Sequence, residues 1–154
     1  MMRATTPLSL KGRALRLLGM REHSRAELAQ KLARHVQEGE DLNAVLDWLV
    51  SKDFLSEERA AESIVHRKAE RYGAARVQQE LRQKGVPEAL IKASVAQLKD
   101  SEQERATAVW QRKFGTLPQT PQERAKQMRF MASRGFGGQA LYRVWRAVAA
   151  GGRA

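Results

Sequence analysis

Apolar residues along the chain recur at intervals of three and four positions, a spacing typical of amphipathic helices. The pattern begins with Leu10, Ala14, Leu17 and Leu18 and continues to Val148. Only 11 Gly and 4 Pro occur in 154 residues, too few for the many tight turns of an all-β fold. We therefore predict an all-α protein.

Several of these helices are predicted to begin at polar residues that accept hydrogen bonds from first-turn amides. Ser24 and Glu27 have the spacing of a capping box, in which the serine accepts from the third amide and the glutamate reaches back. The segment Ser-Glu-Gln-Glu at 101–104 is a second capping box. Ser56 also precedes a helix. The strongest start is Thr-Pro-Gln-Glu at 120–123, which combines a cap, an N1 proline and an N3 glutamate.

The predicted helix stops are a polar stretch and several glycines. They are residues 37–40, Gly73, Gly85, Gly115 and Gly135. Starts and stops together predict nine short helices, with one helix ending near residue 98 and another beginning at 101. The nine form three sets of three, and we expect three-helix units at 8–55, 56–99 and 100–150.

The middle helices of the three sets repeat with a period near 50 residues. Leu32, Leu81 and Phe130 lie 49 residues apart. Leu28 and Val77 match at the same offset, where the third copy has Lys126. Glycines follow at Gly39, Gly85 and Gly135. A degenerate repeat of this length is typical of stacked helical units, so we predict a rod of three units placed end to end.

The net charge of +11 and the pI of about 10.7 predict a polyanionic partner, such as nucleic acid or an acidic protein. The charge is uneven along the chain. Residues 1–55 and 56–100 each have a net charge of +2, whereas residues 101–154 have ten Lys and Arg, three Asp and Glu, and a net charge of +7. The last unit is therefore the most basic one.

Six basic side chains in the last unit are the candidate contacts. Arginine predominates, and its planar guanidinium suits phosphate and carboxylate groups and stacks on aromatic rings. The candidates are Arg124, Lys126, Arg129, Arg134, Arg143 and Arg146. The aromatic residues among them are Phe130, Phe136, Tyr142 and Trp145. Either this surface contacts DNA phosphates or an acidic protein groove, or the aromatic residues form a core with solvated arginines around it.

No constellation for catalysis, metal binding or cofactor binding is present in the sequence. There is no Cys, and the three His do not have metal-ligand spacing. Phosphate loops and nucleophile elbows are absent, and the glycines at 135–138 are interpreted as an interhelical turn. The acid pairs Glu57-Glu58 and Glu102/Glu104 are interpreted as caps of their own helices. No apolar run suggests a membrane span or a secretory signal, so we expect a cytoplasmic protein that is not an enzyme and has no cofactor.

Four segments, in order and spacing, resemble the RecX family of recombinase regulators. They are LRLLGMREHSRAELAQKL at 15–32, FLSEERA at 54–60, YG at 72–73 with ELRQKGV at 80–86, and RFMASRGF at 129–136. Each segment by itself is weak evidence for the family, whereas the four segments in this order and spacing are strong evidence. The resemblance extends from about Ser9 to Ala149.

This resemblance implies three tandem three-helix repeats in an elongated, slightly curved body. It also implies binding to the RecA filament on single-stranded DNA, within the deep groove of the filament and across neighbouring protomers. The implied outcome is inhibition of strand exchange, ATP hydrolysis and repressor cleavage. We also expect the protein to act as a monomer and to bind single-stranded DNA within the filament or, more weakly, directly. The composition is compatible with this function, because it predicts a rod without an active site and with positive charge at one end.

Two other functions are compatible with the residues alone. The first is a stand-alone DNA-binding repeat protein that uses each unit like a helix-turn-helix, although Gln78 and Gln79 are the only paired base-reading candidates in the second unit. The second is a helical adaptor for an acidic protein partner without nucleic acid. Tight, salt-sensitive DNA binding without a recombinase would distinguish the first from the second.

Overall fold

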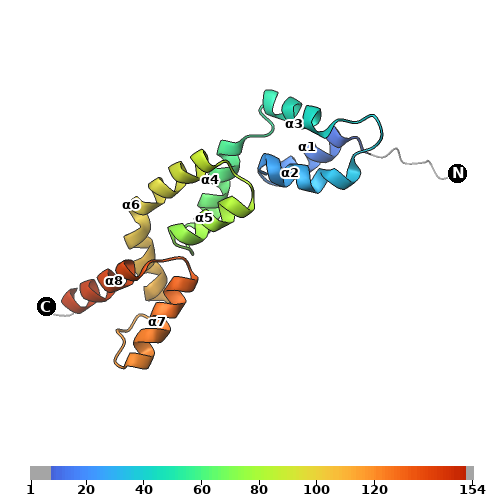
Figure 1. Ribbon diagram of the computed structural model, residues 1–154. Coiled ribbons are helices and arrows are strands. Elements are labelled where there is room, and N and C mark those ends of the chain that lie inside the picture. Colours follow the sequence, from blue (N-terminus) through green and yellow to red (C-terminus); the bar gives the residue numbers. More distant parts are fainter. Residues whose placement is uncertain (1–7, 152–154) are drawn as a thin grey trace.

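The computed structural model describes residues 8–151, and this part of the chain is all-α, as predicted. It contains eight α-helices and one 3-10 helix. Figure 1 shows an elongated molecule, with α1 to α3 at one end and α7 and α8 at the other. No helix in the described residues is long and apolar enough to cross a membrane.

The first set of helices is built around leucines. It consists of α1 (Leu10–Met20), α2 (Arg25–Leu32), a 3-10 turn (Ala33–His35) and α3 (Leu42–Ser51). Its buried core is formed by Leu10, Ala14, Leu28, Leu32, Leu46, Leu49 and Leu55. Because these residues recur at helical spacing, each helix places one apolar face toward the other two.

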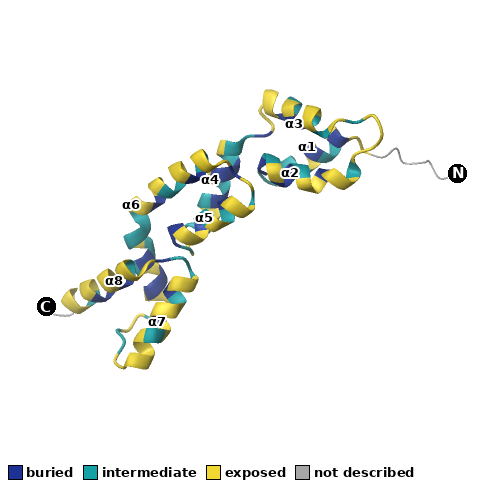
Figure 2. Ribbon diagram, viewed as in Figure 1, coloured by how far each residue is buried: buried dark blue, intermediate teal, exposed yellow. Residues whose placement is uncertain are grey.

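The second and third sets share a helix. The second set consists of α4 (Glu57–Lys68), α5 (Ala74–Gln83) and the first half of α6 (Glu88–Lys113). The third consists of the second half of α6, α7 (Pro121–Ser133) and α8 (Gly138–Gly151). Each set has its own core, centred on Val77, Leu81 and Ile91 in the second and on Trp110, Met131 and Leu141 in the third. Figure 2 shows buried positions in all three sets.

The predicted helix break before Ser101 is wrong, because α6 continues through it for 26 residues. The Ser101 hydroxyl donates to the Leu98 carbonyl at 3.4 Å instead of capping a new helix. The other three predicted caps are confirmed. The hydroxyls of Ser24, Ser56 and Thr120 each accept from the amide three residues onward, at 3.0, 3.2 and 3.1 Å.

The reason for the continuous helix is a difference of two residues between the linkers. Lys-Asp precedes Ser-Glu at both positions, but only the first linker has Phe54 and Leu55 in between. There, Asp53 adopts a left-handed φ of 62°, which ends α3. The second linker lacks this insertion and contains no Gly or Pro, so residues 99–104 continue the helix.

The predicted repeat register is wrong by one residue in the third set. The core positions equivalent to Leu28 and Leu32 are Val77 and Leu81, but in α7 the buried residues are Gln127 and Met131, not Lys126 and Phe130. The spacing from Leu81 to Met131 is 50 residues instead of 49. This shift explains why the predicted repeat placed a lysine at a core position.

Neighbouring sets are linked by one arrangement that occurs twice, which we call a joint. The middle helices of the three sets are α2, α5 and α7. In each joint, the start of one middle helix contacts the end of the middle helix of the next set. It also contacts a glutamate from the first helix of that next set. The first joint consists of Ser24, Arg25, Glu57, Lys84 and Gly85. The second joint consists of Gly73, Ala74, Glu102, Arg134 and Gly135. The sets are therefore fixed to each other by repeated polar contacts.

The backbone of each joint requires glycine. The Gly73 amide donates to the Arg134 carbonyl at 2.7 Å, and the Ser24 hydroxyl donates to the Lys84 carbonyl. The following residues, Gly85 and Gly135, have φ values of 72° and 85°, a left-handed conformation that favours glycine. A Cβ atom at Gly135 would also lie 2.6 Å from a backbone nitrogen of the preceding set. Close backbone approach therefore holds the sets together.

The glutamates of the joints cap helices other than their own. Glu57 accepts from the Arg25 amide, the first of α2, and Glu102 accepts from the Ala74 amide, the first of α5, at 3.1 Å. The interpretation of Glu102 as a cap of its own helix is wrong, because it lies inside α6. Glu57 does lie in the first turn of α4, as predicted, but its carboxylate also caps α2. Their carboxylates stabilise the positive end of the middle helix in the preceding set.

Candidate interaction surfaces

The six basic residues predicted as contacts do not form one site. Five of them are exposed, and Arg134 is partly buried. Lys126 and Arg129 are exposed on α7, whose buried residues are Gln127 and Met131. The other four line three separate hollows of the second and third sets. The third set is therefore basic over much of its surface and does not concentrate its charge.

Arg124 and Arg146 lie beside the exposed ring of Tyr142. The guanidinium of Arg124 is 5.2 Å from the Tyr142 ring centre and 4.9 Å from that of Trp145. Both arginines line a hollow of about 310 Å³ together with these rings. Arg143 lines a different hollow of about 430 Å³, next to the polar side chain of Gln103. Trp145 and Phe136 are buried, so these two aromatic residues belong to the core.

Arg134 lines a cleft between the second and third sets, which we call the second cleft. Its volume is about 320 Å³, and its lining contains four cations and no acid: Arg71, Arg112, Lys113 and Arg134. Tyr72 and Phe130 supply the aromatic part of the lining. The Arg134 guanidinium lies 5.6 Å from the Tyr72 ring centre and 5.0 Å from that of Phe130. Each of the two rings thus already has a cation over its face.

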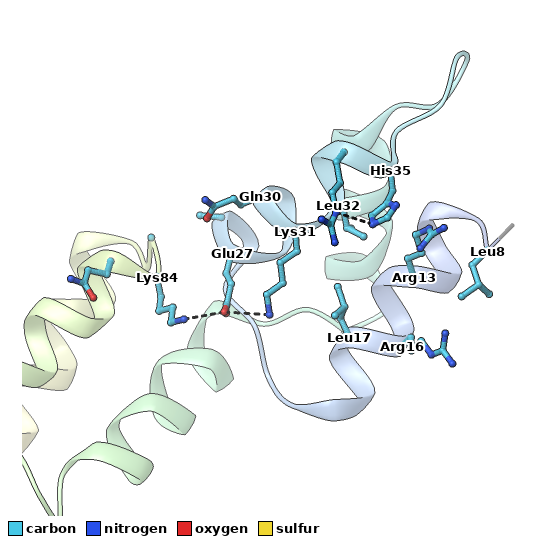
Figure 3. A pocket seen from close by; sticks show the side chains of 14 residues that line it. Leu8, Arg13, Arg16, Leu17, Glu27, Gln30, Lys31, Leu32, His35 and Lys84 are labelled. Atoms are coloured by element: carbon cyan, nitrogen blue, oxygen red, sulfur yellow. Dashed lines mark hydrogen bonds and ion pairs between the residues drawn. The ribbon is translucent and has the colours of Figure 1, made fainter.

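A larger cleft lies where α1, α2 and the 3-10 turn meet the end of α5, and we call it the first cleft. Its volume is about 730 Å³. Figure 3 shows Arg13 and Arg16 from α1, Lys31 from α2 and Lys84 from the second set around this space. Arg34 and His35 also line it. Burial, together with the positive charges of Arg13 and Arg34, lowers the pKa of His35.

Glu27 is the single acid in the lining of the first cleft, and it is already paired. Its carboxylate accepts from Arg21 at 3.1 Å and from Lys84 at 3.2 Å, and Lys31 lies 3.8 Å away. Burial raises the pKa of Glu27, but the hydrogen bonds from Arg21 and Lys84 outweigh it and lower the pKa to about 2. The predicted bond from Glu27 back to its own helix start is not made, because the carboxylate spans the first joint.

His23 is buried beside this carboxylate and is fully hydrogen-bonded. Its Nδ1 lies 2.9 Å from the Arg21 carbonyl and its Nε2 lies 2.9 Å from the Lys31 ammonium. Because an ammonium only donates, Nε2 accepts and Nδ1 donates. Burial lowers the pKa of His23, which favours this neutral form. Among residues 8–151, no group of acids and histidines is arranged to hold a metal ion.

Glu27→Gln is expected to remove a pH-dependent part of the stability. The folded pKa is lowered from 4.5 to about 2, so the contribution of Glu27 is complete above pH 4.5 and is lost as the pH falls to about 2. We expect the variant to be less stable by about 3 kcal/mol at neutral pH and the difference to close in this acid range. Urea denaturation of both proteins across this range measures the difference. A constant difference would contradict the assignment, and Glu38→Gln in the exposed loop is the matched control.

Comparison with known proteins finds one family over most of the chain. Residues 11–49, 56–95 and 100–145 match the first, second and third three-helix domains of RecX. The chain belongs to the RecX family. A regulatory protein RecX of Ralstonia nicotianae is 51% identical over 90% of this chain and 87% of its own length. Another, of Leptothrix cholodnii, is 50% identical over 90% and 88%.

Solved RecX structures share the fold. The crystal structure of RecX from Lactobacillus salivarius gives a TM-score of 0.76 at 15% identity and covers 91% of this chain and 94% of that one. A second crystal structure, of regulatory protein RecX, gives 0.74 at 20% identity and covers 88% and 70%. Three three-helix domains in an elongated arrangement are thus shared by RecX chains of widely different sequence.

Sequence reasoning missed the first cleft of this RecX chain. Its cations are spread from Arg13 to Lys84, and the segments that contain them also contain acids, so the net charge of the first unit is small. The structure places all of those acids except Glu27 elsewhere, for example Asp47 on the exposed part of α3. The spacing of Arg13 and Arg16 by three residues, next to Leu17, was the available signal.

Proposed function

We propose that the chain is a negative regulator of RecA that binds the RecA filament on single-stranded DNA. The observation that carries this proposal is a sequence identity of about one half between this chain and RecX regulatory proteins, over nine-tenths of the chain. As a member of this family the chain is a regulatory protein and not an enzyme. Its action takes place in the cytoplasm, as a monomer, and inhibits the recombinase, ATPase and coprotease activities of RecA.

The elongated body suits a groove, and its charge suits a groove that contains DNA. A filament on DNA has a negative potential that steers a basic protein inward. Three units, with bounds near 8–55, 56–99 and 100–150, would contact neighbouring protomers together and gain avidity. The basic surface of the third set contacts phosphates or acidic protein, and the second cleft extends this surface toward the second set.

The direct test is ATP hydrolysis by RecA on single-stranded DNA, titrated with this protein. We expect inhibition well below one chain per RecA protomer, because a rod bound in the groove affects more than one subunit. No inhibition at excess protein would overturn the proposal. Retention on DNA without RecA, at the same salt concentration, would instead favour a stand-alone DNA-binding protein.

Alanine at four of the candidate contacts is expected to weaken this inhibition and to reduce its salt dependence. The four are Arg129, Arg134, Arg143 and Arg146. Each lost phosphate contact to single-stranded DNA reduces the steepness of log affinity against log salt by about 0.7. A variant with alanine at four other exposed cations has the same net charge; these are Lys52, Arg67, Arg82 and Lys92. Equal inhibition by the two variants would exclude the third set as the contact surface.

A further inference from the structure

The lining of the first cleft contains more cations than acids that could pair with them. Its only acid, Glu27, is neutralised by Arg21 and Lys84. No carboxylate of the described residues lies within ion-pair distance of Arg13, Arg16 or Arg34. Three guanidinium groups around one cavity repel each other, and an anionic ligand relieves this repulsion. The cleft is therefore prepared for a ligand with several negative charges.

The apolar part of the same cleft narrows the class of ligand. Leu8 is 46% exposed at its rim, and the half-buried Leu17 also lines it. In Figure 3, Leu17 projects into the space between Lys31 and the two arginines of α1. A ligand that covers these leucines gains free energy only if it carries an apolar group. The ligand thus combines carboxylates or phosphates with an apolar side chain.

A peptide meets these requirements better than a nucleic acid does. Single-stranded nucleic acid is usually held by aromatic side chains on which its bases stack, and no Phe, Tyr or Trp lines the first cleft. Phosphate and sugar groups also offer little apolar surface for Leu8 and Leu17. An acidic peptide places carboxylates on arginine forks and a leucine-like side chain on the apolar wall.

We propose that the first cleft is the docking site for an acidic, leucine-bearing peptide segment of a partner protein. Its carboxylates pair with Arg13, Arg16 and Arg34, and its apolar side chain packs on Leu8 and Leu17. Lys84 and Gly85 bring the second set into the lining, so a bound peptide contacts both sides of the first joint. The inference goes beyond the regulation of RecA and does not depend on it.

The test is fluorescence anisotropy of the full chain with a labelled peptide in which glutamates alternate with leucines. A peptide with serine in place of each leucine keeps the charge, and a single-stranded oligonucleotide of equal charge is the nucleic-acid probe. We expect the leucine peptide to bind at least about tenfold more tightly than either, because it buries apolar side chains as well as pairing its charges. If the wild-type protein bound the two peptides with equal affinity, the proposal would be overturned.

Charge reversal locates the site. Arg16→Glu with Arg34→Glu is expected to weaken binding of the leucine peptide about a hundredfold, since each charge-assisted contact accounts for about tenfold. The matched control, Arg67→Glu with Lys92→Glu, changes two exposed cations away from the cleft and should bind within about twofold of the wild type. If the cleft variant lost oligonucleotide binding and retained the peptide, the site would be a phosphate site. Because the assay contains no RecA, its failure would leave the proposed regulation unaffected.

Discussion

Gly73→Ala is expected to separate the second and third sets and to destabilise the protein by about 3 kcal/mol or more. An added Cβ atom would lie 2.5 Å from the carbonyl carbon of Gly135 and 2.8 Å from the amide nitrogen of Phe136. Both are backbone atoms, so no side chain can move aside to make room. The same change also displaces the 2.7 Å hydrogen bond from the Gly73 amide to Arg134.

Urea denaturation followed by circular dichroism measures this effect. Gly138→Ala is the matched control, because a Cβ atom there meets nothing within 4 Å and the residue begins α8. Alanine is a better helix former than glycine, so the control should equal or exceed the wild type in stability. If both variants were equally stable, the close approach at the second joint would not contribute to the fold.

Gln127→Leu is expected to cost about 4 kcal/mol, although the equivalent core positions of the other sets hold the apolar residues Leu28 and Val77. The Gln127 carbonyl oxygen accepts from the indole nitrogens of Trp110 at 2.7 Å and Trp145 at 2.8 Å. Its amide nitrogen donates to the Thr116 carbonyl at 3.0 Å. Leucine leaves two buried indole donors without an acceptor, and each costs roughly 1–3 kcal/mol.

A double-mutant cycle separates this loss from a packing defect. Adding Trp145→Phe to Gln127→Leu removes one of the two orphaned donors, so the double variant should be more stable than the sum of the single effects predicts. Tryptophan fluorescence follows the transition, because two of the three Trp are in this network. Strict additivity would show that the indole bonds contribute little.

The sequence predicted what depends on local pattern. The leucine spacing around Leu28 and Leu32 predicts amphipathic helices, and hydroxyl residues such as Thr120 mark helix starts correctly. It did not predict the continuous α6, because a capping signal at Ser101 forms a cap only if the chain breaks before it. That break depends on two residues, Phe54 and Leu55, that are present in one linker and absent from the other.

The same limit applies to the predicted contact residues, because the sequence does not show which side chains share a surface. Counting charges by thirds of the chain located the basic third set, but residues near in sequence, such as Arg143 and Arg146, face different hollows. In the first cleft, Arg13, Arg34 and Lys84 come together from distant segments. The site forms only when α5 packs against the first set, so no continuous stretch of the sequence contains all of its cations.

The chemistry of the joint also determines how the array ends. Pro121 occupies the first helical position that Arg25 and Ala74 hold in the other middle helices, and proline has no amide hydrogen for a further glutamate to accept. At the opposite end, Leu10 follows Ser9 where Glu57 follows Ser56, so no carboxylate is available there to cap another copy. Head-to-tail polymerisation of copies through this contact, an open-ended association that would lead to fibres, is thereby disfavoured at both ends.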